Sequence, residues 1–349
     1  MTAVEWLDSL SPWPRDGFGL DRMRTLLAEL GDPQNTYPAI HVVGTNGKST
    51  AAITIEQLLL SEKLSVGSTI SPHVASWSER IRLDGEEADF EDAVAGVRPA
   101  AERLDATQFE VVTAAALALF AAAQVDAAVV EAGLGGRHDA TNVVQTRVVL
   151  LTNVALEHTD VLGNTLEAIA REKLAVAQAE SIVFLPDGTY ERLVPAGKIR
   201  FGGAREAAEA FMGHAIAATP EVVLPGRLEL RGGAEIRDGA HNPHGARYLL
   251  EQLPAGDYTI VVSILSDKNA DEMLRELRRA GSRLVATRSS SPRALPAAEV
   301  AVLAGTYFDH VEWVDDPVDA LTRAHELGEP VLVTGSLYLL GDIAAGERE

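Results

Sequence analysis

The sequence predicts an α/β fold with two domains, each built on a parallel sheet, of which the second is smaller and Rossmann-like. Three observations predict this class. The chain has 349 residues, more than one typical domain accommodates. Short apolar runs alternate with helical segments, which is the pattern of parallel strands joined by crossover helices. A glycine-rich turn at 44–47 lies between a predicted strand and a predicted helix, as in phosphate-binding domains.

Composition excludes several classes of protein. Hydrophobic residues make up 46% of the chain, enough for a sizeable core, and the absence of cysteine excludes disulfides and thiolate metal sites. A formal net charge of −21 argues against nucleic acid or an anionic membrane as a partner, because both attract basic surfaces. The N-terminus lacks the features of a signal peptide, and the longest apolar stretch, 111–123, is too short to span a bilayer. We therefore expect a cytoplasmic protein that acts on small molecules.

The N-terminal domain is expected to cover residues 1–220. Residues 1–38 are predicted to form two helical pieces separated by a Pro/Gly loop, with the second helix ended by Gly31. Segments 71–86 and 138–142 are interpreted as polar connections. The other predicted elements are strands at 40–43, 65–70, 126–131, 148–158 and 181–186, and helices at 51–60, 108–123, 165–178 and 204–217.

The C-terminal domain is expected to cover residues 224–349. Its pattern begins with an extended stretch at 228–242, which leads into a helix. Strands then alternate with helices at the spacing of a parallel sheet. The predicted helices are 243–253, 270–280 and 317–327, and the predicted strands are 258–265, 283–287, 311–314 and the start of 330–343.

The glycine-rich turn belongs to the stretch HVVGTNGKST at 41–50. A strand, a glycine loop, Lys48 and a helix together present backbone N–H groups and a helix N-terminus to a phosphate chain. Lys48 would reach the terminal phosphates, and the hydroxyl of Ser49 or Thr50 would lie on Mg²⁺. The motif is a shortened variant, because Val42 occupies the position of the first P-loop glycine. A simple turn is the alternative; the flanking strand and helix favour a P-loop ATPase domain.

Metal-capable side chains end three successive predicted strands. They are Ser71, Glu131 and His158. Each one alone fits a solvated or structural residue. Because the carboxyl ends of parallel strands meet at one edge of a sheet, together they predict a Mg²⁺ site beside the phosphate loop. Lys173 lies in the helix that follows, where lysines are usually solvated, and the pattern alone does not single it out.

Several motifs match one known family in the same order. They are GTNGKST (44–50), SPHVASWSERIRLDG (71–85), FEVVTAAA (109–116), VVEAGLGGRHDATNVV (129–144), LTNVALEHTDVLGNTLEAIAREK (151–173), PGRLE (225–229), DGAHNPHGAR (238–247), LSDKN (265–269) and VTGSLYLLGDI (333–343). On these motifs the chain resembles the folylpolyglutamate synthase/dihydrofolate synthase family of the Mur ligase superfamily, nearly from end to end.

The resemblance implies an ATP-dependent amide ligase. In such a reaction a carboxylate of dihydropteroate or of a reduced folate attacks the γ-phosphate of ATP and forms an acyl phosphate. The amine of L-glutamate then displaces phosphate. ATP and Mg²⁺ are the implied cofactors, and the family implies a monomer.

The resemblance also implies a role for each matching residue. Lys48, Lys173 and His241 would be catalytic, with Lys173 matching a lysine that is carbamylated in the superfamily. The nucleotide-binding set would be Thr45, Asn46, Gly47, Lys48, Ser49, Thr50, Arg227 and Asp238; the metal ligands Ser71, Glu131 and His158; and the substrate pocket Thr113, Asp139 and Ala140.

The chain departs from the family pattern at four places, one of which is the helix 165–178, where REKLAVAQ replaces the family's usual sequence. Ser49 follows the lysine where the family usually has glycine, and Glu157 precedes the metal histidine where the family usually has aspartate. The segment 205–219 is short and lacks the asparagine-containing helix that touches the nucleotide. Two alternatives therefore stay open: a related ligase that acts on another carboxylate, and a nucleotide-binding paralogue without catalysis.

Overall fold

The computed structural model describes residues 1–15 and 17–347 and divides the chain into two units. Asp16 of the predicted Pro/Gly loop and the last two residues of the predicted C-terminal domain lie outside the described residues. The first unit comprises residues 1–73 and 77–222. The second comprises Val74–Ser76 and Val223–Glu349. A short segment from the first half of the chain thus packs with the second unit.

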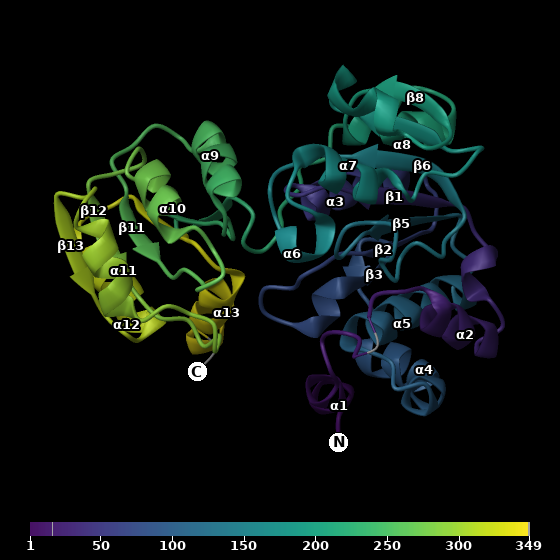
Figure 1. Cartoon of the computed structure of the whole chain (residues 1–349), viewed down its shortest axis with the longest axis horizontal. Helices are drawn as coiled ribbons and strands as arrows, with labels where there is room; N and C mark the ends of the chain where they lie inside the picture. The colour runs from purple at the N-terminus through teal and green to yellow at the C-terminus, as the bar shows by residue number, and fades with distance from the viewer. Residues whose placement is uncertain (16, 348–349) are drawn as a thin grey trace. The chain divides into compact units, whose positions relative to one another are not determined.

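The first unit is built on an eight-stranded sheet with the order β4-β3-β2-β5-β1-β6-β7-β8 (Figure 1). Its pairs are parallel from β2 to β8, and only β3 and β4 are antiparallel. The strands are β1 (Ala39–Val43), β2 (Val66–Thr69), β3 (Ile81–Leu83), β4 (Glu86–Glu87), β5 (Ala127–Glu131), β6 (Thr146–Leu151), β7 (Ile182–Leu185) and β8 (Lys198–Phe201). The central strands β1 and β5 are buried throughout, as parallel strands covered on both faces require.

Helices cover both faces of this sheet. Helices α3 (Lys48–Ser61) and α8 (Ala204–Met212) pack together on one face. The helix α5 (Gln108–Ala122) packs on α4 (Phe90–Arg103), with α2 (Asp21–Glu29) against both and α1 (Ala3–Ser9) against α4. A capping box between Thr107 and Glu110 begins α5. The short helical elements are η1 (Pro33–Asn35), η2 (Trp77–Arg80) and α6 (Thr159–Leu162).

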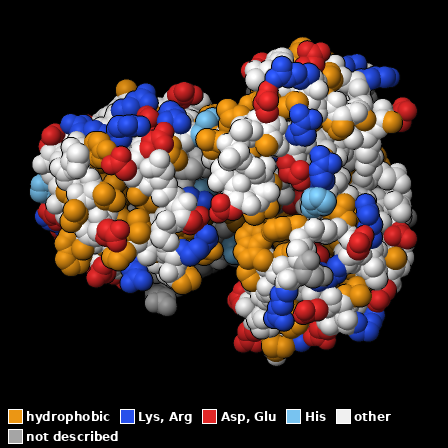
Figure 2. All heavy atoms as spheres, in the orientation of Figure 1, with side chains coloured by type: hydrophobic (Ala, Val, Ile, Leu, Met, Phe, Trp, Pro, Cys, Tyr) orange, Lys and Arg blue, Asp and Glu red, His pale blue; other side chains and the backbone are white. Residues whose placement is uncertain are grey.

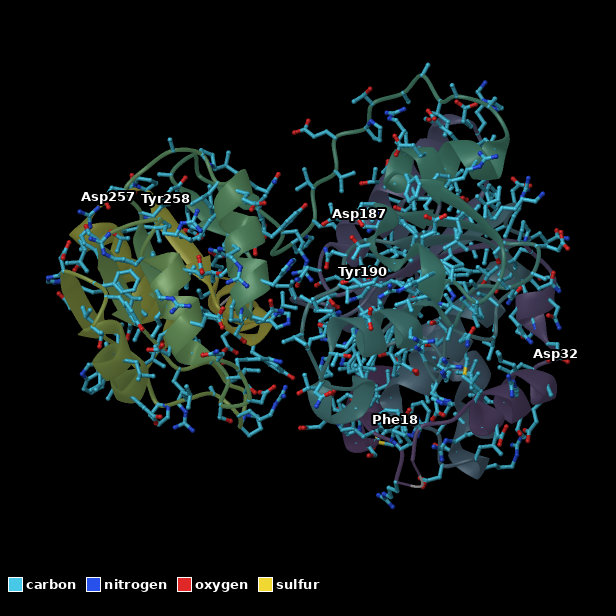
Figure 3. All side chains as sticks on the ribbon, turned by 45° about the horizontal axis from the view of Figure 1, so that its top comes forward. Phe18, Asp32, Asp187, Tyr190, Asp257 and Tyr258 are labelled. Atoms are coloured by element: carbon cyan, nitrogen blue, oxygen red, sulfur yellow. The ribbon has the colours of Figure 1, made fainter. Side chains whose placement is uncertain are left out.

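The helix α7 (Leu166–Leu174) is fixed over the carboxyl ends of β1 and β6. Its residues Ala170 and Leu174 share one apolar cluster with Val43 and Leu151, the last residues of those strands. Tyr190 of η3 (Gly188–Leu193), which Figure 3 labels with Asp187, packs against the same cluster. The cluster therefore positions the C-terminal turn of α7 next to the phosphate loop.

The second unit is a six-stranded sheet in the order β13-β12-β11-β14-β10-β9, parallel except at β9. Its central strands are fully buried, and helices cover it on both sides (Figure 1). The strands are β9 (Glu229–Arg231), β10 (Glu235–Arg237), β11 (Thr259–Val262), β12 (Arg283–Ala286), β13 (His310–Trp313) and β14 (Val331–Thr334). The helices are α9 (Pro243–Gln252), α10 (Ala270–Leu277), α11 (Ala297–Ala304), α12 (Pro317–Leu327) and α13 (Leu337–Gly346). The predicted α/β class with mainly parallel sheets is confirmed.

Four predicted details were wrong. The helix predicted at 204–217 is α8, which ends at Met212 because Gly213 caps it at φ 82°. Strand β6 ends at Leu151, so Glu157 and His158 lie on the turn after it and not at its tip. The connection at 71–86 contains the antiparallel hairpin β3–β4, whose edge position tolerates its polar sequence. Helix α7 ends at Leu174, because Ala175 to Gln178 turn toward β7.

Over residues 1–15 and 17–347, no helix has both the length and the hydropathy needed to cross a bilayer.

Candidate functional site

The phosphate loop connects β1 to α3 with two glycines at positive φ. Gly44 has φ 149° and Gly47 has φ 76°, conformations that other residues adopt at a cost. A Cβ on Gly44 would lie 1.9 Å from the hydroxyl oxygen of Thr152, so only glycine fits there. Gly47 is the N-cap of the 14-residue helix α3 and provides no side-chain cap. The first N–H groups of α3 are therefore available to an anion such as phosphate.

The segment 152–155 holds the phosphate loop from the neighbouring strand β6. The Asn153 side-chain amide bonds to both backbone groups of Asn46: its Oδ1 accepts from the Asn46 N–H at 3.0 Å, and its Nδ2 donates to the Asn46 carbonyl at 2.9 Å. The Thr45 hydroxyl accepts from the Ala155 N–H at 3.0 Å. Within the loop, Lys48 Nζ donates to the Thr45 carbonyl at 3.1 Å. The loop thus has a defined shape before any nucleotide is bound.

An Asn153→Ala variant should bind nucleotide more weakly. Loss of two hydrogen bonds to a loop that must be ordered is expected to raise the KM for ATP by about tenfold. The fold should be retained, since Asn153 is only half-buried. Steady-state kinetics with ATP as the varied substrate measures the effect. The control is Gln145→Ala, which removes an exposed amide bonded to Asn35 at 3.3 Å and should leave that KM unchanged.

Ser71 and Glu131 come together at the ends of two adjacent strands. Strand β2 pairs with β5, and the Ser71 backbone N–H donates to Glu131 Oε2 at 3.0 Å. The Glu131 side chain is only 3% exposed. A buried carboxylate beside a phosphate loop suits Mg²⁺, which usually takes one or two protein carboxylates and completes its shell with water and substrate phosphates. The donor set therefore fits a divalent cation.

His158 occupies a different kind of position from the other two predicted ligands. It is exposed, has φ 45° and begins the short helix α6. Among the described residues, no group of three or more His, Asp or Glu side chains gathers as a ready-made metal cage. A metal at this edge would thus take its protein ligands from Ser71, Glu131 and the turn that carries His158, and would complete its shell with water and phosphate oxygens.

Lys173 is the most deeply buried charge of the site, contrary to the expectation for a helical lysine. It is 1% exposed, and its Nζ donates to the Gly44 carbonyl at 2.7 Å and to Glu157 Oε1 at 2.8 Å. Gly136 lies against the Lys173 backbone so closely that a Cβ would meet the Lys173 carbonyl at 2.5 Å. The lysine therefore ties α7 to the first glycine of the phosphate loop.

The ionisation of this pair is set by burial and by neighbouring charges. Burial lowers the pKa of Lys173 from its ordinary value, and the attraction of Glu157 opposes this only in part. Burial alone would raise the pKa of Glu157, but the charges of Lys173 and Lys48 outweigh it and lower that pKa. Two cations and one carboxylate therefore converge below the phosphate loop, and the local charge favours an anionic ligand.

The three predicted pocket residues are buried in the first unit. Thr113 lies on α5 and is 2% exposed, and Ala140 belongs to the apolar cluster of that helix. Both Asp139 oxygens accept backbone N–H groups: Oδ2 from Leu134 at 2.7 Å and Oδ1 from Thr141 at 3.1 Å. Asp139 therefore organises the loop at 133–142 from inside, and burial raises its pKa despite these bonds.

Acid should destabilise the first unit through His41, which is fully buried on β1. Burial lowers the pKa of His41 from 6.5 to about 4. Between these values the unfolded chain binds a proton at this site and the folded chain does not. The free energy of unfolding should therefore fall as pH falls through this window, by about 1.4 kcal/mol per pH unit from this residue. Above the window the contribution is fully present.

Denaturant unfolding at pH values between about 7 and 4 measures this slope. A His41→Leu variant, which has no group to protonate here, should show a shallower dependence by about one proton. Equal slopes in the two proteins would contradict the assignment.

The predicted residues of the second unit lie on two segments that flank the hairpin β9–β10 and are joined by hydrogen bonds. The half-buried Asp238 follows β10, and its Oδ2 and Oδ1 accept the Leu228 N–H at 2.9 Å and the Ala240 N–H at 2.8 Å. Burial raises the pKa of Asp238, partly offset by these bonds and by Arg227. Arg227 Nη1 donates to the Gly226 carbonyl at 3.0 Å, and His241 Nδ1 lies 2.9 Å from the Gly239 carbonyl. Asp238 thus links the segment that carries Arg227 to the segment that carries His241.

Two functional residues were missed from the sequence. Asn153 was quoted within a motif but given no role, and Glu157 was noted only as a departure. A polar residue soon after β6, the strand that pairs with β1, is the signal that could have identified Asn153. No such signal exists for Glu157, because its partner Lys173 is in contact with it only after α7 has packed.

Two family models match the chain. The model described as "Mur ligase middle domain" matches residues 42–192, and the model described as "Mur ligase, glutamate ligase domain" matches residues 226–337. Dihydrofolate synthase/folylpolyglutamate synthase of Mycobacterium tuberculosis is 31% identical, over 92% of this chain and 85% of that protein.

Solved structures are similar over the whole length. The structure of Escherichia coli FolC in complex with DHPP and ADP has a TM-score of 0.87 and 26% identity, covering 100% of this chain and 99% of that chain. The bifunctional folylpolyglutamate synthase/dihydrofolate synthase of Yersinia pestis, complexed with AMPPNP and Mn ion, also has a TM-score of 0.87 and 26% identity, covering 100% of this chain and 98% of that one.

Proposed function

Because the chain belongs to the folylpolyglutamate synthase/dihydrofolate synthase family of ATP-dependent Mur ligases, we propose that it joins L-glutamate to dihydropteroate, to a reduced folate, or to both. ATP is consumed to ADP and phosphate. The observation that carries the proposal is Lys48 in the first turn of α3, a helix whose N-terminus has no side-chain cap. Such a site favours the triphosphate over a neutral ligand.

The first step forms an acyl phosphate. A carboxylate oxygen of the pterin substrate attacks the γ-phosphorus, and the bond from that phosphorus to the β–γ bridging oxygen breaks, so ADP leaves. Negative charge grows on oxygens near the N–H groups of α3. Lys48 places a positive charge there, which stabilises the negative charge that develops in the transition state.

We propose that Ser71, Glu131 and His158 hold a divalent cation. When bound, this ion would neutralise charge on the phosphate oxygens. Its support in this chain is the buried Glu131 carboxylate next to Ser71.

The second step forms the amide. The neutral amine of L-glutamate attacks the acyl carbon, the bond from that carbon to the phosphate oxygen breaks, and a proton leaves the nitrogen. We propose that Arg227 and Asp238 serve the nucleotide and that His241 serves catalysis, as the family implies. Support for this comes from the Asp238 hydrogen bonds to Leu228 and Ala240, which hold together the two segments that carry these residues.

The carbamylation of Lys173 is a second part of the proposal. Carbon dioxide adds only to a neutral amine, and burial lowers the pKa of this one. Protein incubated with ¹³C-labelled bicarbonate should give a carbamate ¹³C signal that a Lys173→Met variant lacks. If the signals of the two proteins match, Lys173 acts as the ammonium partner of Glu157.

Release of ADP tests the proposed function directly. With ATP, Mg²⁺ and L-glutamate present, release should require dihydropteroate or a reduced folate, and the substrate that supports it decides between the two activities. ATP-dependent turnover with neither would favour a related ligase for another carboxylate. ATP binding without any turnover would favour the non-catalytic paralogue.

A monomeric, cytoplasmic protein without nucleic-acid or membrane partners is also proposed. Acidic and basic side chains are interspersed on the visible face of the first unit (Figure 2).

A further inference from the structure

A histidine in the middle of the first sheet has no role in the reaction described above. His41 lies on β1, opposite Val130 of β5 and Val149 of β6, and is 0% exposed. An imidazole among valines is unfavourable unless it makes hydrogen bonds, because its desolvation is otherwise uncompensated. The buried position of His41 on β1 therefore indicates a role beyond filling the core.

His41 begins a chain of hydrogen bonds that ends in the loop 133–142, which carries Asp139 and Ala140. Its Nε2 lies 2.9 Å from the hydroxyl oxygen of Thr141, and the Thr141 hydroxyl donates to Asp139 Oδ1. Because that hydroxyl gives its own proton to the carboxylate, its oxygen accepts from His41, so Nε2 carries the hydrogen. The other nitrogen of His41, Nδ1, is buried and has no hydrogen-bond partner within residues 1–15 and 17–347.

The chain fixes a loop that is anchored at two places. Asp139 also accepts the Leu134 N–H at 2.7 Å, so residues 133–142 fold around one carboxylate. On its other side the loop is anchored to α7, because the Arg137 N–H donates to the Glu172 carbonyl at 3.0 Å. His41 supplies the anchor to β1, three residues before Gly44 of the phosphate loop.

We propose that His41 is a positioning residue for the pterin substrate, which it serves by holding the Asp139–Thr141 turn at the pocket through the Thr141 hydroxyl. The proposal rests on the proposed function, since the family resemblance implies that Asp139 and Ala140 line the pocket for that substrate. His41 touches no substrate, because it is fully buried in the sheet. A histidine that only filled the core would affect stability without discriminating between substrates.

The test compares KM values for the two substrates in the full-length chain. Thr141→Val removes the hydroxyl at constant shape, and His41→Leu removes the first donor. Each should raise the KM for the pterin substrate by about tenfold and change the KM for ATP by less than about twofold. Thr141→Ser, which keeps a hydroxyl, should behave as the parent chain. The matched control is Tyr37→Phe, which breaks a buried hydrogen bond of 2.8 Å to Leu117 in the same core and should shift neither KM.

Equal changes in both KM values, or none in the pterin KM of folded Thr141→Val protein, would overturn the proposal. A parent chain without turnover on any pterin would refute the proposed function instead. In that case amide hydrogen exchange decides: Thr141→Val should speed exchange in 133–142 by about tenfold relative to Tyr37→Phe. Unchanged exchange there would overturn the positioning role independently of activity.

Discussion

A Lys48→Met variant is expected to lose about a thousandfold in kcat/KM for ATP and to remain as stable as the parent chain. The change removes the cation beside the predicted γ-phosphate, where charge develops in both chemical steps. Among residues 1–15 and 17–347, the Lys48 side chain makes one hydrogen bond, to the Thr45 carbonyl at 3.1 Å, and Lys48 is only half-buried. The free energy of unfolding should therefore change by less than about 0.5 kcal/mol.

An enzyme-coupled assay of ADP release checks the expected loss of activity, and denaturant unfolding checks the expected unchanged stability. Lys198→Met is the control, because Lys198 is exposed on the edge strand β8 and should be replaceable without loss. Activity within about tenfold of the parent chain would show that Lys48 does not act on the reacting phosphate.

The second large effect is expected at Lys173. A Lys173→Met variant leaves the Glu157 carboxylate without its closest partner, which lies at 2.8 Å, and leaves the Gly44 carbonyl without a donor. Breaking a buried pair in this way costs about 3 to 5 kcal/mol of unfolding free energy. Activity should fall by about a hundredfold or more, because the first glycine of the phosphate loop loses its anchor.

A double variant separates the two effects of Lys173. Glu157→Gln combined with Lys173→Met removes both charges, and it should regain most of the lost stability. Activity should stay low, since the anchor at Gly44 is still absent. Full recovery of activity in the double variant would show that the lysine merely neutralises Glu157.

The phosphate loop could be predicted from sequence because its signal is local. Glycines at positive φ, a lysine and a following helix all lie within 41–60, and no distant contact is needed to interpret them. Ser71 and Glu131 could be predicted for a related reason: each follows or ends an apolar strand, and parallel strands bring such residues to one edge. Their mutual contact followed from topology alone.

Lys173 illustrates what the local pattern could not reveal. Its helical neighbours are a mixture of charged and apolar residues, which is typical of a solvated helix face. Its burial arises from the packing of α7 over Leu151 and over Val43, which lies more than a hundred residues earlier in the chain. Only the family resemblance, which the comparisons confirm, pointed to this lysine.

The turn after β6 was mispredicted because its apolar residues extend the strand pattern. Val154 and Leu156 continue the alternation past Leu151, yet the backbone leaves the sheet at Thr152 to reach the phosphate loop. Hydrogen bonds from Asn153 and Ala155 to that loop replace the ladder bonds that a longer strand would have made. Tertiary hydrogen bonds, and not the local apolar pattern, therefore determine where β6 ends.

The central claim is that the chain activates a carboxylate as an acyl phosphate, and isotope transfer tests it most directly. The pterin substrate is labelled with ¹⁸O in its carboxylate and incubated with ATP, Mg²⁺ and L-glutamate. The claim predicts that each inorganic phosphate released carries one ¹⁸O atom, because the attacking oxygen stays with phosphorus when the amine displaces it. Amide product accompanied by unlabelled phosphate would contradict it.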